Sequence, residues 1–377
     1  MSGHTGIPSP TTTAQAGPER PGAALLRRNG RRLARLGPWQ FLLRPRLTLL
    51  CAVAALTLAL LAAAVLPLGP VDALSGGLWP AADPAAATMS TPGEQAMRQM
   101  IWRDIRLPRI LTAMLVGAML GIAGAALQTL ARNELADPGL VGVKEGAAVA
   151  VIAVAVFAPQ WASVWRAAAG LAGGLAVALL VVALARDLSK VRFILVGIGV
   201  SWLLHAVIAV FTTTADIKDV QTALVWMAGS LHAASWRTLA ATAPWAVAGM
   251  AGLLASSRAA DAGSLGHGVA AGLGVNLRRL YALRLLTPCL LTAAAVAAVG
   301  SLGFVGLIAP HLSRLSLGGR QLALLAGSGL YGAALVLLAD SIGRLAFAPL
   351  QIPAGIVMAV IGVPFLLALL WRRRDQL

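Results

Sequence analysis

Long apolar runs recur through most of this 377-residue chain and are separated by short polar stretches. A helix needs about 20 apolar residues to cross ~30 Å of hydrocarbon, so a window of that length is the natural test. The pattern predicts an all-α polytopic membrane protein with about ten transmembrane helices. The predicted crossings lie near residues 47–69, 108–131, 139–158, 166–185, 192–213, 237–256, 280–300, 304–317, 321–340 and 353–371.

Composition agrees with this pattern. The chain is 58% hydrophobic and only 12% charged, with a mean hydropathy of +0.80, whereas a soluble domain carries about 25% charged residues. An ordinary soluble protein is therefore excluded. Cys51 and Cys289 both lie in apolar runs, where we expect packing residues rather than a disulfide.

The charge distribution predicts the orientation of the chain. Residues 1–46 are rich in Pro, Thr and Gly and then in Arg, which predicts a disordered basic cytoplasmic tail; a nucleic-acid-binding tail is the alternative. The net charge of +16 fits the excess of Lys and Arg on the cytoplasmic side. The transmembrane domain then covers 47–374, and residues 375–377 form a cytoplasmic end after the tenth crossing.

Three segments between crossings carry their own patterns. Residues 71–105 contain Trp79 and Trp102 and are predicted to form a loop at headgroup level. Apolar residues recur at helical spacing between 215 and 236, which predicts an interfacial helix. Residues 256–284 are rich in glycine and predict two short cytoplasmic helices broken at Gly266 to Gly268. Because a simple connection needs only about two to eight residues, the extra length indicates a cytoplasmic partner.

Several motifs in order resemble one family. They are RLPR at 106–109, GAMLGIAGAALQ at 117–128, NELADPGLVGVKEGA at 133–147, LGVNLRR at 273–279, GSLGFVGLIAPHLSR at 300–314 and QIPAGIVMAVIGVPFLLALL at 351–370. Together they resemble the permease subunits of binding-protein-dependent ABC importers for iron-siderophores, haem and vitamin B12. The resemblance covers residues 47–374.

The resemblance implies a set of partners and a location. It implies ten helices per subunit, a second permease subunit that is identical or a paralogue, two ATPase subunits inside and a substrate-binding protein outside. The location implied is the bacterial inner membrane, with both termini cytoplasmic. The sequence holds no GxxxxGK[ST] phosphate loop, so we expect no ATPase site in this chain and place ATP and Mg²⁺ on the partner.

No cofactor or metal is expected on this chain. His205, His232 and His311 have no companion histidine or cysteine at metal-ligand spacing.

On the outer side, the resemblance implies that Arg106, Arg109 and Arg344 dock the binding protein. The alternative is interfacial snorkelling, which is ordinary for arginine at helix ends. Asp340 lies four residues before Arg344, a spacing that predicts a paired structural acid. Gln351 stands where the family usually has a glutamate.

On the inner side, the resemblance implies a cytoplasmic gate at Asn133 and Leu135, with Lys190 and Val191 as its second element. Glu134 replaces the family's proline, and Lys144 with Glu145 replaces a pair of small residues. These departures indicate either a different gate or a local salt bridge.

The resemblance also assigns coupling to the ATPase to the loop at about 256–280. The residues concerned are Leu265, Gly266, Gly274, Arg278 and Arg279. The function implied is import of ferric siderophores, with haem or vitamin B12 as alternative substrates. An ion-coupled secondary transporter is the alternative class, which the near absence of charge in the crossings disfavours.

Overall fold

The computed structural model describes residues 32–36, 39–43, 92–158, 162–185, 191–317, 320–346 and 350–373. The chain divides into two units, residues 1–53 and 54–377. The described part of the first unit is an antiparallel hairpin of β1 (Arg32–Leu36) and β2 (Trp39–Leu43). This hairpin lies within the segment predicted to be a disordered tail, where the sequence predicts no strand.

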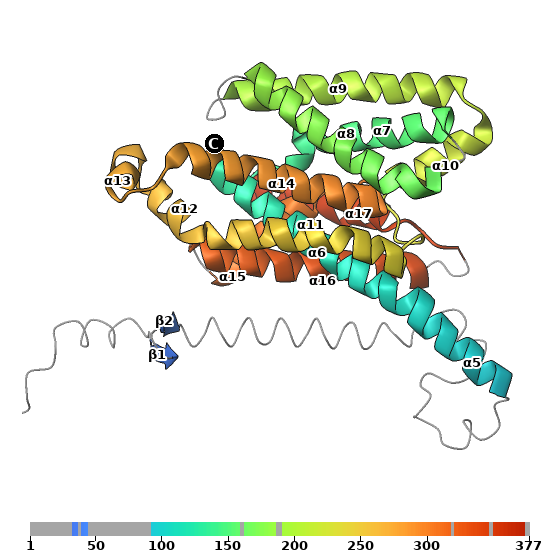
Figure 1. The fold of residues 1–377 in the computed structure, drawn as a ribbon, viewed down its shortest axis with the longest axis horizontal. Helices are drawn as coiled ribbons and strands as arrows, with labels where there is room; N and C mark the ends of the chain where they lie inside the picture. The colour runs from blue at the N-terminus through green and yellow to red at the C-terminus, as the bar shows by residue number, and fades with distance from the viewer. Residues whose placement is uncertain are drawn as a thin grey trace, which may run out of the picture. The chain divides into compact units, whose positions relative to one another are not determined.

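Every described element of the second unit is a helix (Figure 1). In chain order these are α5 (Pro92–Met100), the π-helix η1 (Ile101–Arg106), α6 (Leu107–Ala131), the 3₁₀-helix η2 (Pro138–Val141), α7 (Val143–Phe157), α8 (Ala162–Ala185), α9 (Val191–Thr214), α10 (Ile217–Met227), α11 (Trp236–Ala255), α12 (Ser257–Ser264), α13 (His267–Gly272), α14 (Leu277–Val299), α15 (Val305–Leu317), α16 (Gln321–Leu345) and α17 (Ala354–Arg373).

The helices confirm the membrane fold. Each predicted crossing from the second to the tenth corresponds to a helix, and the first, 47–69, lies outside the described residues. Within the described ranges, 7 helices are long and apolar enough to span a bilayer. The other two, α7 with 15 residues and α15 with 13, are shorter. The chain is therefore an all-α, multi-pass membrane protein.

The shorter predicted elements are also found, with one correction. The interfacial helix is α10, and the two short helices of the inner loop are α12 and α13, which meet at Gly266. The prediction of a loop up to residue 105 is wrong in its last part. There α5 and η1 run without a break into α6, because Pro92 is tolerated in a first helical turn and the charged residues that follow do not prevent a helix.

Helix α6 lies at the centre of the bundle, between α11, α14, α15 and α16 (Figure 1). Of the residues in its most apolar stretch 78% are buried, compared with 11% in the corresponding stretch of α9. Glycines allow this burial, because a Cβ on Gly121 would overlap the carbonyl oxygen of Ser328, and one on Gly117 would overlap that of Gly332. Backbone contact of this kind is how small residues join helices in lipid.

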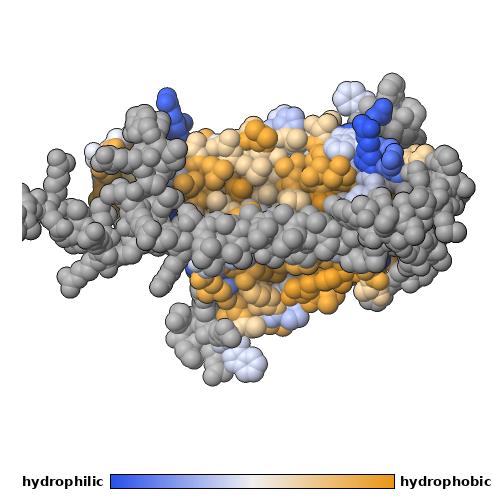
Figure 2. Space-filling model, turned by 90° about the horizontal axis from the view of Figure 1, so that it is seen from below, coloured by the Kyte–Doolittle hydropathy of each residue, from blue (hydrophilic) through white to orange (hydrophobic). Residues whose placement is uncertain are grey.

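Helices α7, α8 and α9 form a second group beside this centre (Figure 1). Buried Val143, Val181, Leu127 and Leu285 join them to α6 and α14. On the face shown in Figure 2, hydrophobic side chains form a band and hydrophilic ones gather towards its two ends. This is the surface expected of a bundle held in a bilayer.

A turn after α10 is hydrogen-bonded to the end of α14 and to the start of α17. The N–H of Ser230 donates to the carbonyl of Val299 at 2.8 Å, and the N–H of Gly355 donates to that of Gly229 at 3.0 Å. Gly229 and Gly300 have φ of +73° and +79°, in the left-handed region that favours glycine. The predicted interfacial helix is thus fixed to the bundle by backbone contacts.

Candidate functional site

At the outer end, Arg109 of α6 is held by two residues from distant parts of the chain. Its Nε and Nη2 donate to the two carboxylate oxygens of Asp340 at 2.9 and 2.8 Å, and its Nη1 donates to Gln351 Oε1 at 3.1 Å. His232 Nδ1 lies 3.3 Å from the same Gln351 oxygen. Asp340 is thus a paired acid, as predicted, and one partner is Arg109, 231 residues away along the chain. The bidentate pair therefore joins α6 to α16.

The other two predicted docking arginines are also mostly covered by the chain itself. Arg106 is 7% exposed and Arg344 8% exposed. The guanidinium of Arg106 lies 5.6 Å from the centre of the Trp102 ring, within cation–π range. The structure thus places all three arginines at one end of the bundle, which the sequence predicts to be the outer one, and their docking role stays a prediction.

The π-helix η1 contributes a residue that the motif does not include. Arg103 is exposed, and its carbonyl oxygen accepts a hydrogen bond from Trp236 Nε1 at 2.9 Å. A π turn leaves carbonyls outside the normal i→i−4 ladder, and such turns are frequent at functional sites. Exposure, rather than any sequence motif, identifies Arg103 as an arginine of this end that is available to a partner.

At the inner end, α6 stops in a tight turn. Arg132 has φ of +50°, and its N–H reaches the carbonyls of Gln128 and Thr129. The side chain of Asn133 accepts from the N–H of Leu135 at 2.9 Å, which closes the turn. Asn133 and Leu135 are exposed, so the two predicted gate residues stand at the surface.

Asp137 follows in the same loop and caps η2. Its Oδ1 accepts from the N–H of Gly139 at 2.8 Å. Burial raises the pKa of this carboxyl, and the Gly139 hydrogen bond and the charge of Lys144 act in the opposite direction.

Lys144 and Glu145, which stand where the family has two small residues, form a local ion pair. Lys144 Nζ lies 3.8 Å from Glu145 Oε1, and His205 Nδ1 of α9 lies at the same distance from that oxygen. The second oxygen, Glu145 Oε2, is buried without a hydrogen-bond partner among the described residues. Lys190 lies outside the described residues, and Val191 begins α9. The gate remains a prediction, with a local salt bridge beside it.

The predicted coupling segment projects apolar side chains from two short helices. Leu265, Val269 and Leu273 are 64%, 52% and 63% exposed. Gly266 and Gly274 bound α13 with φ of +107° and +77°, so their backbone conformation requires glycine although a Cβ would meet no atom. Arg278 and Arg279 are exposed in the first turn of α14. Apolar groups exposed together on a loop indicate a contact surface.

Beneath this segment lies a buried polar network that the sequence did not predict. Arg284 of α14, 2% exposed, donates from Nη1 to Gln321 Oε1 at 2.8 Å. Gln321 Nε2 donates to Thr129 Oγ1 at 3.2 Å, and the Gln321 N–H donates to Asp261 Oδ1 at 3.0 Å. Arg284 Nε also donates to Ser256 Oγ at 3.4 Å. The available signal was a charged residue within an apolar run, which is rare and costly in a membrane helix.

Gln128, the residue before Thr129 in α6, is also held by hydrogen bonds from side chain to neighbouring helix. Arg314 Nη1 donates to Gln128 Oε1 at 2.7 Å, and Gln128 Nε2 donates to the carbonyl of Gly306 at 3.1 Å. The last turn of α6 is therefore bound through two neighbouring side chains, Gln128 and Thr129, to α15 and α16.

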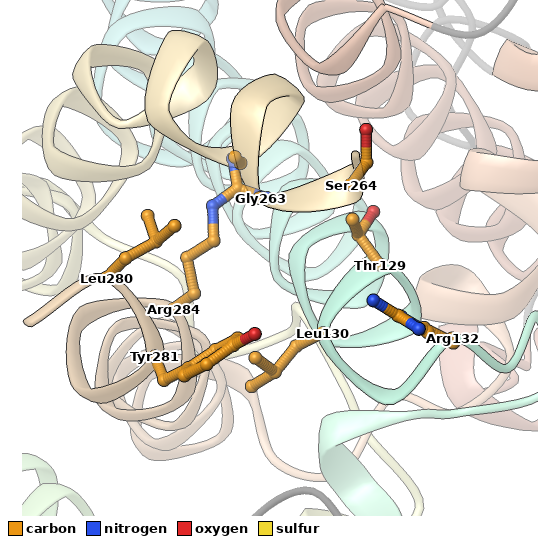
Figure 3. A pocket seen from close by; sticks show the side chains of 9 residues that line it. Thr129, Leu130, Arg132, Gly263, Ser264, Leu280, Tyr281 and Arg284 are labelled. Carbon is orange, nitrogen blue, oxygen red and sulfur yellow. The ribbon is translucent and has the colours of Figure 1, made fainter. Parts of the chain in front are cut away.

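A cavity of about 450 Å³ lies between α12 and the inner end of α6. In Figure 3, Gly263 and Ser264 of α12 lie at the top, Thr129 and Arg132 from the end of α6 on the right, and Arg284 and Tyr281 of α14 on the left. The cavity separates the predicted coupling segment from the predicted gate helix.

Among the described residues, no group of three or more His, Cys, Asp or Glu side chains is placed to hold a metal ion. Cys289 is a buried free thiol in α14.

Residues 49–372 match the model of the FecCD transport family. The chain is 36% identical over 286 residues to the iron(3+)-hydroxamate import system permease protein FhuG of Bacillus subtilis, covering 74% of this chain and 85% of that protein. It is 38% identical over 304 residues to the cobalamin import system permease protein BtuC of Halobacterium salinarum, covering 80% and 81%.

The hemin transport system permease protein HmuU of Yersinia pestis is 36% identical over 286 residues, covering 73% of this chain and 84% of that protein. A solved structure of a metal-chelate type ABC transporter in an inward-facing conformation matches with a TM-score of 0.74 and 28% identity, covering 86% of this chain and 99% of that one.

Proposed function

Because the chain belongs to the FecCD transport family, we propose that it is the membrane-spanning permease subunit of an ATP-driven importer of ferric siderophores. Relatives named for hydroxamate iron, cobalamin and hemin support the class. Haem or vitamin B12 are the alternative substrates. The sequence has no GxxxxGK[ST] loop, so ATP and Mg²⁺ are assigned to a partner ATPase.

One observation carries the ATP-driven class: the apolar projection formed by α12 and α13. Leu265, Val269 and Leu273 are each more than half exposed, although burying a large apolar side chain is favourable by about 1.5–3 kcal/mol. These side chains fit a groove on an ATPase subunit, with Arg278 and Arg279 beside them. An ion-coupled secondary transporter has no use for such a projection.

The outer end is proposed to receive a substrate-binding protein. The proposed docking residues are Arg106, Arg109 and Arg344, together with the exposed Arg103. Because Arg109 holds Asp340 inside the bundle, its part is to fix the outer ends of α6 and α16 for docking. Exposed ion pairs are each worth about 0–1 kcal/mol, so this contact gives orientation more than affinity.

A second permease subunit, a copy or a paralogue, is proposed to complete the pathway. Large side chains of α9, such as Leu195, Trp202, Leu203 and Val210, are 62–73% exposed. They are available to that subunit or to lipid. The gate at Asn133, Leu135, Lys190 and Val191 closes the pathway at its inner end. Both termini are proposed to be cytoplasmic, in a bacterial inner membrane.

Uptake by reconstituted vesicles tests the proposal. The permease is purified with its ATPase subunits, placed in liposomes and supplied with a binding protein loaded with radioactive ferric siderophore. Uptake is expected only with ATP on the ATPase side and with the binding protein present. Uptake driven by an ion gradient in vesicles that contain no ATPase would instead support a secondary transporter.

Charge reversal tests the docking end. Arg103→Glu is expected to slow uptake at low binding-protein concentration while assembly with the ATPase is unchanged, since the docking charge is reversed and α12 and α13 are untouched. Arg166→Glu, at a half-buried arginine near the start of α8, is the control. Equal uptake by the two variants would remove Arg103 from the docking surface.

A further inference from the structure

The inner network joins the coupling segment to the gate helix, and this inference rests on the proposed function. Asp261 of α12 accepts from the N–H of Gln321 at 3.0 Å. The Gln321 side chain reaches Thr129 in the last turn of α6. Thr129 precedes the gate residue Asn133 by four positions, which is about one helical turn. Gln321 therefore links α12, in the predicted coupling segment, to the last turn of α6, next to the predicted gate.

No direct packing substitutes for this connection where the cavity lies. Gly263 and Ser264 of α12 and Thr129 and Leu130 of α6 line a cavity of about 450 Å³ (Figure 3). A shift of α12 therefore does not press on this part of α6. The hydrogen-bonded path through the start of α16 transmits it, and the cavity leaves α12 room to move.

Arg284 gives the path its rigidity. Its Nη1 bond holds the amide of Gln321 in the orientation that turns Nε2 towards Thr129. Its Nε reaches Ser256, the residue that precedes α12. Asp261 also acts electrostatically on this guanidinium. A hydrogen-bonded side chain with a buried charged partner has few alternative conformations, because leaving the charge unpaired is costly.

We propose that Gln321 and Arg284 are positioning residues that transmit movement of α12 to the inner end of α6, so that ATP turnover is coupled to the gate. Chains of packed and hydrogen-bonded groups are the physical means by which two sites become coupled. Cutting the chain therefore separates ATP hydrolysis from transport.

The experiment measures ATP hydrolysis and substrate uptake in the same vesicles, which contain the whole importer and loaded binding protein. Thr129→Val removes the hydroxyl and keeps the shape of the side chain, and Gln321→Leu removes both arms of the amide. Thr112→Val is the matched control, since Thr112 is buried in the same helix and its Oγ1 has no hydrogen-bond partner among the described residues.

Both test variants are expected to assemble and hydrolyse ATP, while substrate transported per ATP falls about tenfold, within the usual range of coupling between sites. The control keeps the wild-type ratio. The double variant falls no further than Gln321→Leu, because both changes cut one path. A merely structural role would lower stability and leave the ratio unchanged. If Gln321→Leu fails to assemble, the isosteric Thr129→Val decides.

Two negative results are distinguishable. Wild-type ratios in both test variants, with normal ATP-driven uptake by the unmodified importer, would overturn this inference alone. Absence of ATP-driven uptake by the unmodified importer would overturn the proposed function and this inference with it.

Discussion

The bidentate pair between Arg109 and Asp340 makes a strong prediction about stability. Their side chains are 13% and 7% exposed, so neither is well hydrated in the folded chain. Hydrogen bonds to charged groups are worth about 1.5–3 kcal/mol each, and Arg109 makes two to Asp340. Removing one partner of a buried pair costs about 3–5 kcal/mol. Arg109→Leu and Asp340→Leu are each expected to lose that amount of unfolding free energy.

The double variant distinguishes the cost of leaving a buried charge unpaired from the loss of the hydrogen bonds themselves. With both residues replaced by Leu, neither charge is left unpaired, and such replacements are often close to neutral. Arg109→Leu with Asp340→Leu is therefore expected to be more stable than either single variant. Arg258→Leu, at an exposed arginine of α12, is the control and is expected to change stability by less than about 0.5 kcal/mol.

Cys289 provides the assay. The sequence has 2 cysteines, and Cys289 is only 1% exposed. In a Cys51→Ser background, a fluorogenic thiol reagent labels Cys289 when the bundle opens, and titration with denaturant in mixed micelles gives the free energy. Single variants within about 1 kcal/mol of the parent, or a double variant showing the sum of both losses, would refute the reasoning.

Four further substitutions test the helix packing, the turn after α10 and the loop after α6. Gly121→Ala drives a Cβ into a backbone carbonyl and is expected to cost at least about 2 kcal/mol; the same assay should show Gly252→Ala, with open space around it, gaining about 0.5–1 kcal/mol. Gly229→Ala meets both a positive φ and a carbonyl, so a loss of about 2 kcal/mol or more is expected on thermal unfolding, and an unchanged midpoint would contradict it. Since burial raises the pKa of Asp137 above its usual 3.8, the folded state binds the proton more tightly, and stability falls as pH rises from about 4 through the raised pKa. Asp137→Asn should flatten that part of the stability–pH curve, and an identical slope in both proteins would refute the assignment.

Most of the helices could be predicted because hydropathy over a membrane-spanning length determines where they lie. A stretch that must cross hydrocarbon has to be apolar over its whole length, and this signal located α6 to α9, α11 and α14 to α17. Helix α5 was missed because it begins at Pro92 and carries charged residues such as Arg98, and hydropathy does not detect a polar helix. Local capping and helix propensity govern such a segment instead.

The pairing of residues could not be predicted in the same way. Spacing along one helix reveals neighbours three or four positions apart, and it offered Arg344 to Asp340. It cannot reveal Arg109, which pairs with Asp340 from a helix more than two hundred residues earlier. Glycines such as Gly117 and Gly121 indicate that another backbone approaches closely, but the sequence does not show that this backbone is α16.

The π-helix η1 also has a consequence for the geometry of the outer end. In an α-helix, one residue corresponds to a rotation of roughly 100°, and a π turn accommodates an additional residue without breaking the rod. Deleting one residue between Ile101 and Arg106 would let an ordinary helix form, and would turn α5 by about that angle about the common axis. The number of residues in this turn therefore determines which way the side chains of α5 face about the helix axis.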